Sequence, residues 1–212
     1  GTLIADGYGQ TETINIVGNF PGIETRFGSM GKPVPGYNVD IVNDDGAILP
    51  DGEIGHIAIN TQGWWPAGLF HGYLKDGVLI TNAFKNGWYF TGDTASRDAD
   101  GYLWFVGRSD DLISSAGYRI SPFEVESALL EHEAIAESAV IGKEDATRGQ
   151  IVKAFIVLAS GHTASDVLSK EIQEFCKKLT APYKYPREIS FVQDLPKTIS
   201  GKIRRVELRN DS

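Results

Sequence analysis

The residues whose chemistry is easiest to interpret lie near the start of the chain, in Tyr8-Gly9-Gln10-Thr11-Glu12. Glycine frees the backbone to approach a phosphate, the threonine hydroxyl can donate to one, and the carboxylate can hold a hard cation such as Mg²⁺. A glycine turn closed by a capping threonine would have the same sequence. The cluster alone therefore favours an ordinary turn over a phosphate site.

A second cluster, Tyr89-Phe90-Thr91-Gly92-Asp93, ends in a carboxylate. An aspartate at the end of a strand can accept hydrogen bonds from two neighbouring sugar hydroxyls. Asp93 is therefore a candidate for binding ribose. Taken alone, the pattern favours an ordinary turn aspartate.

A third cluster is the segment Pro196-Lys197-Thr198-Ile199-Ser200-Gly201-Lys202. Proline fixes the approach of the chain, and Ser200-Gly201 predicts a turn that would direct Lys202 outward as a point charge. Lysines are common on protein surfaces. Without further context, Lys202 is an exposed surface residue.

Two further clusters carry basic residues. Gly107-Arg108-Ser109-Asp110-Asp111 leads through Ala116-Gly117-Tyr118-Arg119 towards a predicted helix, and Arg148 and Lys153 flank the start of a predicted strand. Neither cluster is specific by itself.

The charge is unevenly distributed along the chain. The net charge is −8, which argues against general binding to nucleic acid. Residues 177–209, however, contain nine basic and three acidic side chains. A local basic surface of this kind suits a small polyanion such as a nucleotide, although a solvated basic tail is the simpler interpretation.

The elements that must hold these clusters are of two kinds. From Pro35 to Val106 short alternating runs are separated by turns at Asp44-Asp45-Gly46 and Pro50-Asp51-Gly52, and Asp100-Gly101 predicts a hairpin. This pattern indicates the β-rich part of a distorted barrel or sandwich. The second kind of pattern begins after Ser109.

In the second part, Ser121, Pro122 and Glu124 predict a capped helix that runs to about His132. Strands are expected at 135–141, 152–158 and 189–192. Ser165 should cap a second helix whose apolar stripe comprises Leu168, Ile172, Phe175, Cys176 and Leu179. The fold class is α+β, with a β-rich domain at residues 1–109 and a small α+β domain at 110–212.

Taken together and in their order along the chain, the five clusters resemble the adenylate-forming superfamily of acyl-CoA synthetases, luciferases and peptide-synthetase adenylation domains. The match covers essentially the whole chain. Gln10, Arg119 and the stretch Pro66–Tyr73 look most like the medium-chain acyl-CoA synthetases.

The resemblance implies a two-step reaction. ATP and a carboxylic acid give an acyl-adenylate and pyrophosphate, and the thiol of coenzyme A then displaces AMP. It implies that Lys202, Thr11 and Glu12 are catalytic, with Glu12 and Thr11 at Mg²⁺. It also implies a hinge at Asp110, about which the small domain would rotate to withdraw Lys202 and bring in the Gly117 loop.

The remaining site residues implied by the resemblance bind ATP, AMP or coenzyme A. Gly9, Gln10 and Thr11 should line the adenine and the α-phosphate, and Asp93 should bind the ribose with help from Arg108. The full set for nucleotide and coenzyme is Gly7, Tyr8, Gly9, Gln10, Thr11, Asp93, Arg108, Ala116, Gly117, Tyr118, Arg119, Arg148, Lys177, Tyr185, Pro186 and Arg187.

The family's phosphate-binding loop and most of its acid pocket have no counterpart here, so the resemblance implies the C-terminal part of such an enzyme, inactive by itself. Apolar surface is then expected at Trp64, Trp65 and Trp88. Two alternatives stay open, an enzyme that loads a carrier protein and a non-catalytic nucleotide-binding relative.

The expected partners are ATP, coenzyme A and a small carboxylic acid, a fatty acid of short or medium chain length. No apolar run is long enough to span a bilayer. The single cysteine, Cys176, fits a reducing compartment. We expect a cytoplasmic protein, or one of the mitochondrial matrix in a eukaryote.

Overall fold

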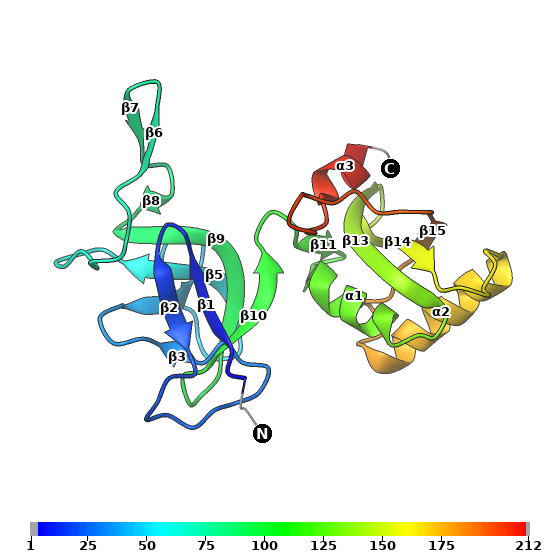
Figure 1. Cartoon of the computed structure of the whole chain (residues 1–212), viewed down its shortest axis with the longest axis horizontal. Coiled ribbons are helices and arrows are strands. Elements are labelled where there is room, and N and C mark those ends of the chain that lie inside the picture. Colours follow the sequence, from blue (N-terminus) through cyan, green and yellow to red (C-terminus); the bar gives the residue numbers. More distant parts are fainter. Residues whose placement is uncertain (1–3, 211–212) are drawn as a thin grey trace. The chain divides into compact units, whose positions relative to one another are not determined.

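Short antiparallel strands joined by glycine turns build the first half of the chain (Figure 1). The computed structural model describes residues 4–210 and divides into two units, Gly1–Ser109 and Asp110–Ser212. The strands of the first unit are β1 (Gly7–Gln10), β2 (Ile14–Gly18), β3 (Lys32–Pro33), β4 (Val39–Val42), β5 (Ile54–Asn60), β6 (Tyr73–Lys75), β7 (Val78–Ile80), β8 (Phe84–Lys85), β9 (Trp88–Arg97) and β10 (Leu103–Arg108).

The largest sheet of the first unit has the order β10-β9-β5-β4, with β8 paired to β9. The hairpin predicted at Asp100-Gly101 is confirmed, because β9 and β10 pair antiparallel on either side of it. Side chains on the inner face, including Ile41, Ile57 and Leu103, pack against Ile16 and Val17 of the small sheet β1-β2-β3. The strands described here form open sheets and no closed barrel.

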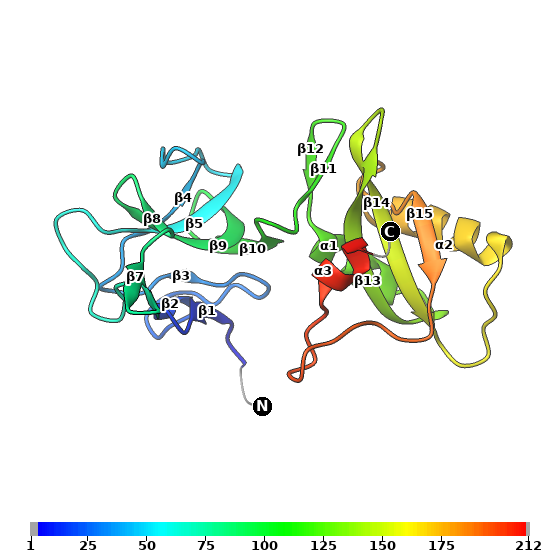
Figure 2. The same ribbon diagram turned by 90° about the horizontal axis from the view of Figure 1, so that it is seen from above.

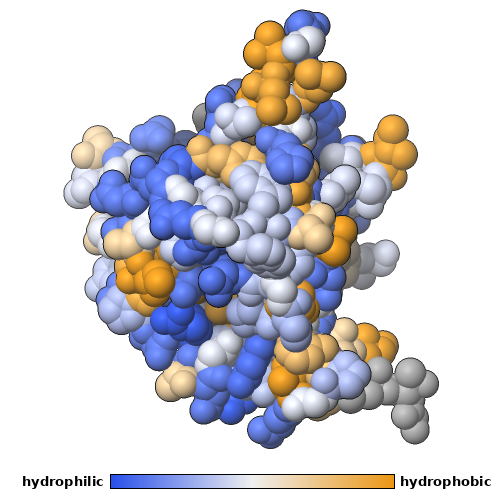
Figure 3. Space-filling view, turned by 90° about the vertical axis from the view of Figure 1, so that its left-hand side faces the viewer, coloured by the Kyte–Doolittle hydropathy of each residue, from blue (hydrophilic) through white to orange (hydrophobic). Residues whose placement is uncertain are grey.

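The hairpin of β6 and β7 extends beyond the larger sheet and presents apolar side chains to solvent. It forms the projection at the top of Figure 3, and Leu74 is 76% exposed and Val78 64% exposed. The exposure expected for Trp64 and Trp65 is confirmed. The expectation for Trp88 is wrong, because it packs with Val42 and Ala58.

The second unit has a sheet with the order β12-β11-β14-β13, to which β15 adds in parallel with β14 (Figure 2). All other pairings in this sheet are antiparallel. Its elements are β11 (Ile113–Ser115), β12 (Tyr118–Ile120), α1 (Pro122–Leu130), β13 (Ile135–Asp145), β14 (Gly149–Leu158), α2 (Asp166–Leu179), β15 (Glu188–Phe191) and α3 (Arg205–Asn210). The α+β class predicted from the sequence is confirmed.

Both predicted helix starts are confirmed by their caps. The Ser121 hydroxyl accepts a hydrogen bond from the backbone N–H of Glu124, and the Ser165 hydroxyl accepts one from Leu168. These bonds satisfy backbone donors that the first helical turn leaves without partners. On α2 the predicted apolar stripe holds at Ile172 and Cys176, which are buried, but Leu179 at the end of the helix is exposed.

Alternation along β13 and β14 divides the core of this unit into two layers. Val140, Ala154 and Ile156 face α1 and α2, whereas the intervening residues Ile141 and Phe155 face the opposite side. Leu195 and Leu208 of the C-terminal segment cover that second side. The sheet is therefore buried on both faces, once by helices and once by the last part of the chain.

Within residues 4–210 the structure has no helix both long and apolar enough to pass through a bilayer.

Candidate functional site

Asp93 is the centre of a polar cluster in the first unit. Its side chain is 9% exposed, and its Oδ2 accepts hydrogen bonds from the Tyr8 hydroxyl at 2.6 Å and from Gln10 Nε2 at 2.9 Å. Both donors lie on β1, whereas Asp93 lies on β9. Two strands far apart in the sequence thus fix the orientation of one buried carboxylate.

Gln10 is itself held at both ends of its amide. Its Nε2 also donates to the carbonyl oxygen of Thr91 at 2.9 Å, and its Oε1 accepts from the Tyr89 hydroxyl at 3.0 Å. The Thr91 hydroxyl in turn accepts from the backbone N–H of Asp93. The predicted cluster around residues 8–12 and the predicted cluster around residues 89–93 are therefore parts of one hydrogen-bonded site.

The predicted position of Asp93 at a strand end is wrong. Asp93 lies inside β9, next to Gly92, whose φ is 80°. The register between β5 and β9 shifts between His56 and Ala58, on the stretch opposite these residues. A bulge of this kind turns a side chain away from the regular alternation of the strand. It explains how an interior residue can face Tyr8 and Gln10.

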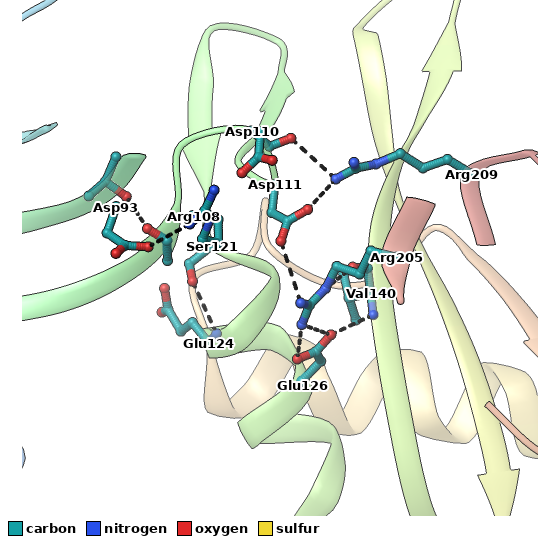
Figure 4. Close-up of polar contacts among 12 residues, drawn as sticks. Asp93, Arg108, Asp110, Asp111, Ser121, Glu124, Glu126, Val140, Arg205 and Arg209 are labelled. Atoms are coloured by element: carbon teal, nitrogen blue, oxygen red, sulfur yellow. Dashed lines mark hydrogen bonds and ion pairs between the residues drawn. The ribbon is translucent and has the colours of Figure 1, made fainter. Parts of the chain in front are cut away.

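Arg108, the last residue of β10, pairs with Asp93 in the strand register. Its Nη1 lies 3.8 Å from Asp93 Oδ1, the oxygen that neither Tyr8 nor Gln10 contacts (Figure 4). About half of the Arg108 side chain is exposed. One side of the carboxylate is thus bound by fixed donors, and the other faces a half-exposed cation.

Burial raises the pKa of the Tyr8 hydroxyl, and the hydrogen bond to the Asp93 carboxylate raises it further. Burial likewise raises the pKa of Tyr89. Both hydroxyls therefore stay protonated across the physiological range. They can act as hydrogen-bond donors to the site and not as bases.

Glu12 lies in the turn between β1 and β2, and its carboxylate accepts a hydrogen bond from the Tyr73 hydroxyl of β6. The turn is closed by the buried Thr13, whose hydroxyl accepts from the backbone N–H of Gln10 at 3.0 Å. Thr11, the neighbouring residue, is exposed. Glu12 and Thr11 thus present one carboxylate and one hydroxyl at the edge of the site.

The two glycines of β1 lie close to β2, and Gly9 is needed for contact between the backbones. A Cβ on Gly9 would lie 1.9 Å from the carbonyl oxygen of Ile14, and one on Gly7 would lie 3.1 Å from the side chain of Asn15. At Gly9 this leaves no space for any other residue. The structure shows a close approach of the strands β1 and β2 at Gly9, and the approach of Gly9 to a phosphate stays a prediction.

Lys202 lies in a short loop of the second unit. The backbone N–H of Thr198 donates to the Lys202 carbonyl at 2.8 Å, and the Thr198 hydroxyl accepts from the Lys202 N–H at 3.0 Å. Gly201 has a φ of 81°, as a tight turn favours. The turn predicted at Ser200-Gly201 is present, and Lys202 is exposed.

The Gly117 loop is the turn of the hairpin β11–β12. Ala116 and Gly117 have φ values of 50° and 85°, as a type I′ turn requires. The Ala116 N–H donates to the carbonyl of Arg148 at 2.9 Å, so the predicted residues Arg148 and Gly117 lie on adjacent turns. Arg119 and Tyr118 of β12 are exposed, and the Tyr118 ring stacks on Tyr183.

Lys177 and Arg187 share the ring of Tyr185. The Lys177 Nζ lies 4.2 Å and the Arg187 guanidinium 4.9 Å from its centroid. The buried Pro186 carbonyl accepts from Gln173 of α2, which fixes this turn. Two cations are therefore gathered on one aromatic ring.

Lys153 forms an ion pair within the sheet of the second unit. Its side chain is buried in β14 and its Nζ lies 3.0 Å from Glu188. Lys153 therefore does not form a basic cluster with Arg148, which is exposed at the turn between β13 and β14. Asp110 is exposed at the start of the second unit, and its carbonyl accepts a hydrogen bond from Arg209.

Two protein-family models match the chain. The family described as AMP-binding enzyme matches residues 1–74, and the AMP-binding enzyme C-terminal domain matches residues 124–202. The chain belongs to the adenylate-forming superfamily. The resemblance inferred from the five clusters is thereby confirmed, and each unit of this adenylate-forming chain carries one matched segment.

Curated relatives are similar along nearly all of the chain. The rat (Rattus norvegicus) mitochondrial acyl-coenzyme A synthetase ACSM3 is 54% identical over 99% of this chain, and the 4-hydroxybutyrate–CoA ligase 1 of Metallosphaera sedula is 54% identical over 97%. The chain spans 36% of the length of each of these adenylate-forming relatives.

Solved structures agree with the fold. The anthranilate CoA ligase AuaEII in complex with anthranoyl-AMP is 41% identical, with a TM-score of 0.82 over 98% of this chain and 39% of that one. The Bacillus subtilis o-succinylbenzoate CoA synthetase in complex with its acyl-adenylate is 32% identical, with a TM-score of 0.81 over 97% and 40%. Both support the superfamily assignment.

Sequence reasoning missed Tyr89 and Thr91 as partners of the site. Both lie in the cluster that ends at Asp93, at alternate positions 89, 91 and 93. The register shift in β9 interrupts the regular alternation at Asp93, so the signal in the sequence was their place in the same five-residue cluster as Asp93. Tyr73 had no comparable signal, because its contact with Glu12 joins a turn to the strand β6, which is distant in the sequence.

Proposed function

We propose that this chain is part of an ATP-dependent ligase that joins a carboxylic acid to coenzyme A through an acyl-adenylate. The observation that carries the proposal is 54% identity along almost the whole chain to proteins named as an acyl-coenzyme A synthetase and a CoA ligase. The cluster of Tyr8, Gln10 and Asp93 supports it, because a carboxylate fixed by two donors suits the hydroxyls of a ribose.

The first step needs no general base, because the nucleophile is already an anion. A carboxylate oxygen attacks the α-phosphorus of ATP, and the bond to the bridging oxygen of pyrophosphate breaks. In the second step the sulfur of coenzyme A attacks the acyl carbon, AMP leaves with the oxygen, and the thiol proton is released. What the protein must supply is orientation and positive charge.

In the first unit, Gly9, Gln10 and Thr11 would line the adenine and the α-phosphate, with Asp93 and Arg108 at the ribose. Glu12 and Thr11 would hold Mg²⁺. A single carboxylate fits this ion, since Mg²⁺ is commonly bound by one or two carboxylates together with substrate phosphates. When bound, Mg²⁺ would neutralise phosphate charge.

In the second unit, Lys202 would bridge phosphate and carboxylate oxygens during adenylation, where its charge offsets the charge that develops in the transition state. The exposure of Lys202 supports this role. We propose that the small unit, 110–212, turns about Asp110 between the two steps and exchanges Lys202 for the Gly117 loop.

Coenzyme A would be recognised by basic residues of the second unit. Arg148 and Arg119 accompany the Gly117 loop, and Lys177 and Arg187 share the Tyr185 ring. These cations favour the free coenzyme with its 3′-phosphate over a carrier protein. Turnover compared between coenzyme A and a holo-carrier protein separates the two.

The test of the proposed function is Lys202→Ala in the full-length protein. Adenylation, measured as ATP–pyrophosphate exchange, should fall by roughly 100-fold or more, as for loss of a group that stabilises transition-state charge. Thioester formation from supplied acyl-adenylate should persist. Equal loss of both steps would contradict the role of Lys202.

The acid is proposed to be a short- or medium-chain fatty acid, and a panel from acetate through octanoate to benzoate identifies it. Location in the cytoplasm or in the mitochondrial matrix stays a prediction for this chain; the name of the rat relative states that that protein is mitochondrial.

A further inference from the structure

A partly buried ion network ties the end of the described chain to the start of the second unit. At its centre is Glu126 of α1, whose side chain is 9% exposed. Both of its oxygens lie 2.7 Å from Arg205 Nη2, and Oε1 also accepts from the backbone N–H of Val140 at 2.7 Å (Figure 4). A charge-assisted cluster with this geometry holds its members in one arrangement.

The same network reaches the residues that follow Ser109. Arg205 Nη1 lies 3.5 Å from Asp111 Oδ2, and Arg209 donates to Asp111 Oδ1 and, at 3.2 Å, to the carbonyl of Asp110. Both arginines lie on α3, and Figure 4 shows them pointing towards the segment 110–111 from that helix. The first and last parts of the second unit are therefore joined by side chains.

Arg205 follows Lys202 by three residues. The loop between them is closed by its own backbone bonds, from Arg204 N–H to the Pro196 carbonyl at 2.8 Å and from Thr198 N–H to the Lys202 carbonyl. On the far side of α3, Leu208 packs into the second core layer with Leu195. The position of the Lys202 loop is thus determined by where α3 is held.

A structural requirement alone does not explain the choice of residues. Replacing a buried ion pair by apolar residues of similar volume is often neutral or stabilising. What an arginine adds is a rigid, planar set of donors, of which Nη2 contacts Glu126 and Nη1 contacts Asp111 here. In this network it fixes α3 with respect to α1 and to the segment 110–111.

We infer that Arg205 is a positioning residue for Lys202, because its pairs with Glu126 and Asp111 lock the Lys202 loop to the residues at the hinge. Arg209 extends this clamp to Asp110. When the small unit turns, the hinge segment and the lysine loop then move as one rigid piece. The inference rests on the proposed function, in which Lys202 acts only during adenylation.

The experiment replaces Arg205 by glutamine and by lysine in the full-length protein and measures each half-reaction separately. ATP–pyrophosphate exchange should fall by roughly 10- to 100-fold, since a misplacement of about 1 Å far from the chemistry can cost about 100-fold. Thioester formation from supplied acyl-adenylate should change by less than about 2-fold, because Lys202 has no part in it. Arg205→Lys keeps the charge and loses the paired donors, so it should show the same split.

Arg204→Gln is the matched control. Arg204 is the neighbouring arginine, its side chain is 54% exposed, and it pairs with Glu207 on the surface. Its backbone bond to Pro196 does not depend on the side chain. Both half-reactions of this variant should equal those of the unmodified protein.

Two results overturn the clamp: unchanged exchange in both Arg205 variants, or an equal fall of the two half-reactions, which marks a purely structural role. If neither variant folds, hydrogen exchange of the unmodified protein decides. The amides of α3 should be protected as strongly as those of α1, and rapid exchange in α3 would refute the clamp. Lys202→Ala, assayed in parallel, shows separately whether the proposed function itself fails.

Discussion

At the scale of single residues, the site depends on hydrogen bonds that give one carboxylate one orientation. Asp93 Oδ2 receives two donors from β1, which leaves Oδ1 towards Arg108. The types of these residues were evident in the sequence, and so was their grouping into two clusters. Their mutual contact was not, because it depends on a bulge in β9 that the pairing of distant strands produces.

Tyr8→Phe tests this orientation. The change removes the 2.6 Å hydrogen bond to Asp93 and keeps the ring. Hydrogen bonds to charged groups contribute about 1.5–3 kcal/mol, so the KM for ATP should rise by roughly 10-fold or more. Steady-state kinetics of the full-length protein measure it, with kcat expected to change less than KM.

The control for Tyr8→Phe is Tyr37→Phe in the same unit. The Tyr37 hydroxyl donates to the carbonyl of Thr13 at 2.9 Å and has no bond to Asp93. This variant can lose stability, but its KM for ATP should stay within about 2-fold. An equal rise in both variants would show that Tyr8 acts only on packing.

At the scale of elements, local signals were sufficient where a few neighbouring residues decide the structure. Ser121 and Ser165 cap the helices that they were expected to cap. The hairpin β11–β12 and the helix α3 were not predicted, since the strands have three residues each and the helix has six, too few for a useful periodicity. Tertiary contacts define them, such as the single pair Ser115–Gly149 that joins β11 to β14.

The sheet of the second unit predicts a dependence of stability on pH. Glu188 of β15 lies 2.8 Å from Lys143 and 3.0 Å from the buried Lys153. Both pairs lower the pKa of the Glu188 carboxyl, and the hydrogen bond from Lys143 has the larger effect. The unfolded chain therefore binds this proton more readily than the folded one. The stabilisation is complete above the ordinary glutamate pKa of 4.5 and is lost as the pH falls through the lowered folded value.

Glu188→Gln should remove that dependence and leave Lys153 without its carboxylate. Because Glu188 is about one-third exposed, the cost at neutral pH should be about 1–2 kcal/mol, below that of breaking a fully buried pair. Urea unfolding at pH 7 and at a pH below the lowered pKa of folded Glu188 measures it, and the two proteins should converge at the lower pH. A difference that is independent of pH would contradict the assignment.

At the scale of the whole molecule, each unit contains a core of its own. Ile41, Ile57 and Leu103 lie in that of the first unit, and Val140 and Ile156 in that of the second. The change of sequence character after Ser109 indicated where to divide the chain, because alternating strands give way to capped helices there. No local sequence pattern describes how the units move with respect to each other. That motion is part of the proposed function, which places a hinge at Asp110.

Residues 110–212 expressed alone should accordingly fold. A segment of this length with its own core is within the range of independent domains. Calorimetry should show one cooperative transition for this piece and the same transition, beside a second one, for residues 1–212. A single transition for the longer chain, or no cooperative transition for the piece, would show that the units depend on each other.

The two-sided burial of the sheet in the second unit has a consequence for biosynthesis. A ribosome releases β13 and β14 long before it releases the segment with Leu195 and Leu208, which covers Ile141 and Phe155. Until that segment emerges, one apolar side of the nascent sheet lies open to water. The interval before the segment from Leu195 to Leu208 leaves the exit tunnel is then when this unit most needs a chaperone.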